Sequence, residues 1–153
     1  MNIRYENESS TDVMTGGPDK RRQLYYQLIA SMKKAESVDI IVSFLMESGV
    51  KMLLKELENT LKRGAKIRIL TGNYLGITQP SALYLIKRKL GDRVDLRFYC
   101  EKGRSFHPKS YIFHYANHSE LYIGSSNISK SALTSGIEWN YRFSSKKDPE
   151  NYE

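Results

Sequence analysis

The sequence predicts an α/β fold in which a mixed, largely parallel sheet is flanked by helices on both faces. Two short apolar runs rich in β-branched residues, 38–44 and 66–70, have the length and composition of buried strands. Segments with apolar residues at helical spacing precede and follow each run. Strands that alternate with helices favour a parallel sheet, and the loops that follow such strands gather at one edge.

The elements can be assigned in chain order from periodicity and from their end signals. Asp19 is a plausible N-cap for a first helix that continues to about residue 35, with Leu24, Leu28 and Met32 at helical spacing. Gly64 and Gly91 follow two further amphipathic segments and are typical of helix ends. The later elements are expected as a strand at 38–44, a helix at 48–63, a strand at 66–70, a helix at 80–90, strands at 93–100, 109–115 and 120–124, a short helix at 127–133 and a last strand that ends at 143.

The composition suits one folded unit that acts on a polyanion. With 153 residues and 40% hydrophobic content, residues 20–153 are expected to form a single domain. Residues 1–19 are polar and are expected to form an irregular N-terminal arm. The polar end at 146–153 brings no closing element, so we expect a domain of a longer protein. The formal net charge of +7 points to nucleic acid or to an acidic membrane surface.

The cysteine content and hydropathy indicate a cytoplasmic protein. Cys100 is the only cysteine in the sequence, which precludes an intramolecular disulfide and favours a reducing compartment, and we expect it to be a small core side chain. No apolar run approaches the ~20 residues that span a bilayer. Three histidines with one thiol are also a poor match to a structural zinc site, so we expect no metal.

His107 and Lys109 are the first candidate catalytic residues. If the chain after Pro108 is a strand, its period of two places both side chains on one face, where they can reach the same anion. A nucleophile or base and a fixed cation would then share one pocket.

A second group of candidates lies in the turn after 121–123 and in the run after it. Gly124 and the serines Ser125 and Ser126 would let backbone N–H groups approach a phosphate oxygen at the start of a helix. Asn127 adds a side-chain amide there. Glu138 is expected to accept a hydrogen bond from a histidine ring and to fix which nitrogen faces the substrate.

Two loops supply candidate substrate contacts. Asn73 and Tyr74 follow the strand at 66–70, at the edge where ligands usually bind such sheets. Tyr74 either stacks on a base or packs on its neighbours, and the sequence leaves both open. Arg104 lies in the loop that leads to His107, where it is placed to recruit phosphate.

These residues carry a family resemblance. His107-x-Lys109, Gly124-Ser125-x-Asn127 and a carboxylate eleven residues later resemble the phospholipase D superfamily, and most closely its short nuclease-like members with one motif per chain. The resemblance extends from about residue 38 to the end of the chain. The phrases 70–79 and 136–142 further resemble the phospholipase-D-like domain at the N-terminus of some bacterial DEAD/DEAH-box helicases.

The resemblance implies a phospholipase D-like fold and a metal-independent phosphodiesterase without a cofactor. It implies that His107 forms a phosphohistidine, that Lys109 and Asn127 stabilise phosphoryl charge, and that Glu138 orients His107. One motif per chain implies a homodimer with a shared active site. The expected partners are nucleic acid, taken to be DNA, and a C-terminal helicase-type domain of the parent chain. The alternatives are a catalytically weak nucleic-acid-binding module and, with less support, a phospholipid-processing enzyme.

The sequence departs from the family pattern in two places. The family's aspartate, five residues after the lysine, is usually regarded as structural and is replaced here by His114. The segment between Lys109 and Gly124 is also three residues longer than usual. The extra residues fall at 115–119, which is expected to be a hairpin turn where insertions are tolerated.

Overall fold

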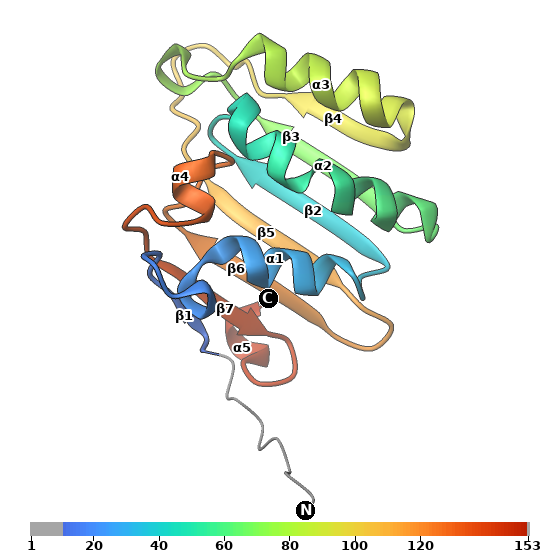
Figure 1. Ribbon diagram of the computed structural model, residues 1–153, viewed down its shortest axis with the longest axis vertical. Coiled ribbons are helices and arrows are strands. Elements are labelled where there is room, and N and C mark those ends of the chain that lie inside the picture. The colour runs from blue at the N-terminus through green and yellow to red at the C-terminus, as the bar shows by residue number, and fades with distance from the viewer. Residues whose placement is uncertain (1–10, 153) are drawn as a thin grey trace, which may run out of the picture.

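Seven strands form one sheet in the computed structural model, which describes residues 11–152 (Figure 1). Their order across the sheet is β1-β7-β6-β5-β2-β3-β4. The strands are β1 (Val13–Met14), β2 (Ser37–Val42), β3 (Lys66–Thr71), β4 (Val94–Phe98), β5 (Lys109–His114), β6 (Ser119–Gly124) and β7 (Asn140–Ser144). The helices are α1 (Leu24–Met32), α2 (Glu47–Lys62), α3 (Pro80–Leu90), α4 (Lys130–Leu133) and α5 (Pro149–Tyr152), with 3₁₀ turns at Lys20–Arg22, Tyr74–Gly76 and Gly91–Arg93.

The prediction of an α/β fold with a mixed sheet is confirmed, but the sheet is less parallel than expected. Only the pairs β2–β3 and β3–β4 are parallel, and the other four of the six described pairings are antiparallel. The alternation of strand and helix that favours parallel pairing ends with β4. From residue 109 onward, β5 and β6 form a hairpin around the turn at 115–118, where a crossover helix has no room.

The helices α1 to α4 lie on the same face of the sheet, whereas the sequence suggested helices on both faces (Figure 1). β2, β3 and β4 follow one another in a single direction across the sheet. Right-handed crossovers between strands added in one direction place their helices on one side. The segments α2 and α3 are these two crossovers, so they pack side by side.

The core lies between these helices and the sheet. Val38, Ile40 and Val42 of β2 face the helices and are fully or almost fully buried, as are Leu53 and Ile86 of α2 and α3. The opposite face of the sheet is only partly shielded: Ile41, Leu70, Ile112 and Leu121 there are half-buried.

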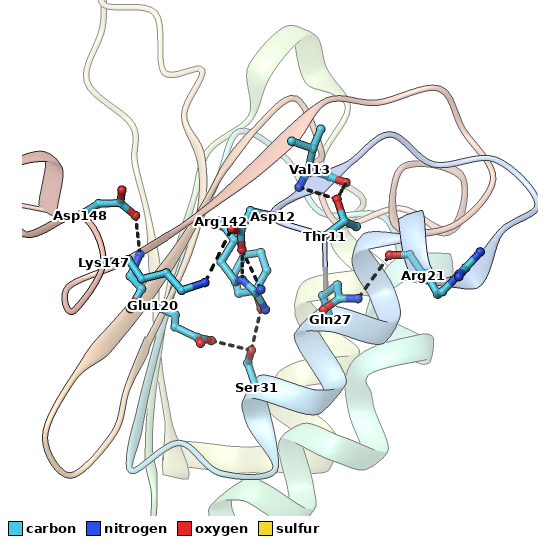
Figure 2. A network of polar contacts seen from close by, with 12 residues as sticks. Thr11, Asp12, Val13, Arg21, Gln27, Ser31, Glu120, Arg142, Lys147 and Asp148 are labelled. Atoms are coloured by element: carbon cyan, nitrogen blue, oxygen red, sulfur yellow. Dashed lines mark hydrogen bonds and ion pairs between the residues drawn. The ribbon is translucent and has the colours of Figure 1, made fainter. Parts of the chain in front are cut away.

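The N-terminal segment is attached to the sheet from β1 onward. Residues 1–10 of the expected irregular arm lie outside the described residues, but β1 pairs with β7 and Met14 is fully buried. Arg142 of β7 donates from Nη2 to Asp12 Oδ1 at 2.7 Å, and Ser31 Oγ of α1 donates to Glu120 Oε2 of β6 at 3.3 Å (Figure 2). These contacts tie the start of the described chain and α1 to the strands β6 and β7.

Cys100 departs from the sequence prediction. β4 ends at Phe98, two residues earlier than expected, so Cys100 falls in the following loop and is exposed. The prediction that Cys100 is a core side chain is therefore wrong.

Candidate active site

The candidate residues meet at one edge of the sheet. Val42, the last residue of β2, pairs with Thr71 at the end of β3 and with Lys109 at the start of β5. On the other side of β5, Gly124 at the end of β6 pairs with Asn140 at the start of β7. Lys109 at the start of β5 and the loops that carry the other eight predicted residues therefore lie at this edge of the sheet (Figure 1).

Lys109 places a buried ammonium group at this edge. The residue is 9% exposed, and its Nζ donates to the carbonyl oxygen of His107 at 2.9 Å and to Ser43 Oγ at 3.2 Å. Burial lowers the pKa of Lys109, and the negative charge of Glu138 opposes that shift. The ammonium of Lys109 thus contacts the backbone of His107, and the expectation that the two side chains reach one anion stays a prediction.

His107 itself precedes β5 and is exposed. Its ring lies against the ring of Tyr74, with the centroids 4.2 Å apart. Among residues 11–152, the structure contains no hydrogen bond to either of its ring nitrogens. The imidazole is thus open to a ligand from the solvent side.

Ser43 is a residue of the site that the sequence reasoning missed. It follows β2, is fully buried, and its Oγ donates to the carbonyl oxygen of Pro108 at 3.1 Å while it accepts from Lys109. The only signal in the sequence was its place at the end of a predicted strand, an edge where functional side chains gather. Nothing in the sequence linked it to Lys109, which is 66 residues away.

The two predicted phosphate-binding serines differ. Ser125 is exposed, its Oγ donates to Glu138 Oε2, and it also accepts from the backbone N–H of Trp139 at 2.9 Å. Ser126 is fully buried, and its hydroxyl donates to the carbonyl oxygen of Ala132 at 3.1 Å and accepts from Asn140 Nδ2 at 2.9 Å. Of these two serines, only Ser125 presents its side chain to solvent.

The turn that carries these serines is tightly packed at Gly124. A Cβ at this position would lie 2.0 Å from the carbonyl oxygen of Trp139. β6 and β7 can therefore approach each other here only because position 124 lacks a side chain. This approach brings Ser125 to Glu138.

Asn127 lies in the turn before α4 and is 5% exposed. Its Oδ1 accepts from the backbone N–H of Phe44 at 3.2 Å, so the side chain ties the turn to the segment after β2. The helix was expected from residue 127 but begins at Lys130, because Ser129 caps it by accepting from the N–H of Ala132.

Glu138 is half-buried, and its negative charge acts on Lys109, whose pKa it raises. No hydrogen bond joins it to His107 within the part of the chain that the structure describes. The expectation that Glu138 orients a histidine ring stays a prediction.

The remaining candidates line a shallow pocket of about 340 Å³ beside His107. Asn73 and Tyr74 form one wall, and Arg104 belongs to the loop that forms the other. Asn73 and Arg104 are exposed, and Arg104 pairs with Glu101 at 3.7 Å.

His114, which stands where the family has an aspartate, lies at the far end of β5. Its Nε2 is 3.1 Å from Asp39 Oδ2 and its Nδ1 is 3.0 Å from Ser119 Oγ. Arg68 donates to both oxygens of Asp39, at 2.6 and 2.7 Å. This cluster is bonded within itself and faces away from the helices, and none of its hydrogen bonds in the described residues reaches Lys109 or Ser43.

Two further observations concern ions and membranes. Within residues 11–152, no three His, Cys, Asp or Glu side chains gather around a point where one metal ion could bind. The helices in the same range are all too short or too polar to cross a membrane.

The sequence and the structure were compared with known proteins. The family described as "cardiolipin synthase, PLD-like domain" matches residues 26–153. Curated protein sequences give no significant match. The match to the family covers every candidate residue discussed above.

Solved structures share the fold at low sequence identity. NucT from Helicobacter pylori is similar with a TM-score of 0.56 and 15% identity, over 83% of this chain and 82% of that one. Polyphosphate kinase from Porphyromonas gingivalis gives a TM-score of 0.64 and 15% identity over 93% of this chain and 20% of its own length. Phosphatidylserine synthase from Haemophilus influenzae gives 0.58 and 12% over 85% and 33%. The chain thus spans most of NucT and a third or less of the two larger proteins.

Proposed function

This chain belongs to the phospholipase D superfamily, and we propose that it is a metal-independent phosphodiesterase that cleaves nucleic acid through a phosphohistidine intermediate. One ring nitrogen of His107 forms a P–N bond while the P–O bond to the leaving oxygen breaks. The His107 of a second subunit gives its proton to that oxygen. Water then attacks phosphorus, returns a proton to that second histidine, and the P–N bond breaks.

The observation that carries this proposal is the buried ammonium of Lys109, which donates to the backbone carbonyl of His107, a residue whose side chain is exposed at the same sheet edge. Ser43 Oγ accepts from this ammonium and fixes it at the start of β5. A fixed cation in a partly dry site stabilises the charge that develops on phosphoryl oxygens more strongly than one in water. Asn127 supports the same role, because its oxygen is engaged by Phe44 and its amide N–H₂ is left to donate.

A shared site in a homodimer follows from the chemistry. The reaction needs one histidine to attack and another to act as acid, and among residues 11–152 only His107 lies at this edge. A two-fold axis beside the motif would supply the second. The mechanism needs one of the two rings neutral to attack and the other protonated to act as the acid.

Nucleic acid is the proposed substrate because the chain carries a formal net charge of +7 and presents Arg104 at the pocket. We expect DNA. We also propose that the domain serves a longer protein with a C-terminal helicase-type motor, on the resemblance of 70–79 and 136–142 to such domains.

The test is cleavage of end-labelled DNA and RNA oligonucleotides by the purified protein in EDTA, with products resolved on a gel. Native protein should cleave, and His107→Ala should lose at least ~10³-fold in rate, because the nucleophile is gone. His118→Ala is the matched control, because His118 lies in the hairpin turn at 115–118 and should leave the rate unchanged.

Two outcomes would contradict the proposal. Binding of DNA without cleavage by either protein would favour a binding module that has lost its activity. Hydrolysis of cardiolipin or phosphatidylglycerol vesicles, with no cleavage of nucleic acid, would favour phospholipid processing, in line with the description of the matched family.

A further inference from the structure

Tyr74 lies against the imidazole of His107, and we propose that it is a positioning residue that sets the orientation of this ring. The two centroids are 4.2 Å apart with 41° between the ring planes. No hydrogen bond within residues 11–152 restrains the ring nitrogens, so the tyrosine ring is what restricts rotation of the imidazole in one subunit. The catalytic meaning of this role rests on the function proposed above.

The backbone around Tyr74 is strained in a way that favours the contact. Leu75 has φ of 51° and ψ of 24°, and it is the only residue other than glycine with positive φ in the described chain. The left-handed region is unfavourable for a leucine, and strain of this kind concentrates at functional sites. The side chain of Leu75 is 78% exposed, so its own packing does not compensate. The turn instead holds Tyr74 toward His107.

The far end of the Tyr74 loop is anchored to the segment after β2. Thr78 is 8% exposed, and its Oγ1 donates to the carbonyl oxygen of Gly72 and accepts from the N–H of Leu45 at 3.3 Å. Gln79 Oε1 accepts from the N–H of Glu47 at 2.7 Å. Thr78 thus joins the two ends of the loop from 72 to 79, and Gln79 ties that loop to the start of α2.

The loop that carries His107 packs against the loop from 72 to 79. A Cβ at Gly72 would lie 2.9 Å from Cδ1 of Phe106, so glycine is needed for the close approach of the residue just before His107. The other side of Phe106 stacks on Tyr99, with centroids 4.6 Å apart and 19° between planes. Phe106 thus fixes the backbone of His107, and Tyr74 fixes its ring.

This arrangement decides between the two roles that the sequence left open for Tyr74. Its ring is used to pack on a neighbour, and that neighbour is the proposed nucleophile. The Tyr74 hydroxyl has no hydrogen bond in residues 11–152, so the contact depends on the ring alone. Phenylalanine should therefore substitute for Tyr74, and leucine should not.

The direct test is NMR of the histidine ring protons in native protein, Tyr74→Phe and Tyr74→Leu. Ring-current shifts at His107 should be present in the first two proteins and lost in Tyr74→Leu. His118, which stacks on Tyr115 at 4.6 Å, is an internal reference that should not change. Tyr84→Leu, at a position 66% exposed on α3, is the matched control. Unchanged His107 resonances in Tyr74→Leu would overturn the proposal, even in a protein that cleaves nothing.

The kinetic test separates positioning from base stacking. Tyr74→Leu should lower kcat ~10- to 100-fold at unchanged KM, because the nucleophile is misplaced. The loss should be the same on a normal and an abasic oligonucleotide, and Tyr74→Phe should restore it. A rise in KM confined to the oligonucleotide with bases would show that Tyr74 stacks on substrate and would overturn the positioning role. Absence of cleavage by native protein would count against the proposed function, and the NMR result would still decide the contact.

Discussion

Two histidines, one just before β5 and one at its end, are in opposite situations. Before the strand, the His107 ring has an aromatic contact but no described hydrogen bond, and the buried Lys109 begins the strand two residues later. At its end, the His114 ring is bonded on both nitrogens, to Asp39 and Ser119. The ring nitrogens of His107 are thus left without a described partner in the protein, whereas those of His114 are both paired within the sheet.

This difference indicates that the residues at the start of β5 are suited to bind a substrate and that those at its end stabilise the fold. A catalytic group must keep bonding capacity for its substrate, whereas a structural group lowers the free energy most when every polar atom is paired. The position at which the family carries an aspartate belongs to the second kind here. The carboxylate of that cluster comes from Asp39 on the neighbouring strand β2.

The largest effect is expected at the start of β5. Lys109→Met should lower the rate of DNA cleavage by about 10²- to 10³-fold, because it removes the cation that we propose stabilises the phosphoryl oxygens. Thermal unfolding should show little loss of stability, since an apolar chain of similar length replaces a buried ammonium. Lys55→Met, at an exposed position of α2, should match native protein. Full activity of Lys109→Met would mean that the two ends of β5 do not differ in the way described.

Asp39→Asn tests the other end of the strand. It should destabilise the fold by about 2 kcal/mol, because Arg68 and His114 lose a charged acceptor, and leave the cleavage rate per folded molecule unchanged. Urea titration measures the first effect, and the gel assay measures the second. A large loss of activity in a stably folded Asp39→Asn would show that the Asp39 cluster contributes to the active site.

The same variant has a pH signature. Hydrogen bonds from Arg68 hold the pKa of Asp39 below its usual range, with a smaller contribution from His114. A carboxylate whose folded pKa is lowered contributes stability above its unfolded pKa, and this contribution is lost as the pH falls through the folded value. The difference between native protein and Asp39→Asn should therefore shrink as the pH falls below about 4.

A smaller effect is expected when the family's aspartate is restored. His114→Asp would place a second carboxylate beside Asp39, and the repulsion, partly screened by Arg68, should cost ~1 kcal/mol. Cleavage should not increase. A gain in cleavage rate would show instead that the aspartate serves catalysis from this position, and that the cluster of Asp39 is only its partial replacement.

Local patterns predicted much of the fold and of the site. The helices α2 and α3, the strands β2 and β3 and the hairpin of β5 and β6 were found because periodicity and turn residues act over a few neighbours. His107, Lys109 and Ser125 were brought to one edge as expected, because a short motif encodes which strand end each residue occupies.

Contacts between distant residues could not be predicted. The bond from Lys109 to Ser43 and the pairing of His114 with Asp39 join residues 66 and 75 positions apart, and each depends on strand order. The direction of β5 to β7 relative to β2 decided that the sheet is mostly antiparallel, and no single segment carried that information. Ser125 and Ser126 looked equivalent in sequence, and only the register of β6 with β7 buries one of them.

The most direct measurement for the central claim is covalent trapping. An internally ³²P-labelled oligonucleotide is mixed with the protein in EDTA, quenched in denaturant and resolved on a denaturing gel. We expect label on the native protein, removed by acid as a phosphohistidine requires, and none on His107→Ala. Label that persists on His107→Ala, or cleavage by native protein that never labels it, would contradict the assignment of His107 as the nucleophile.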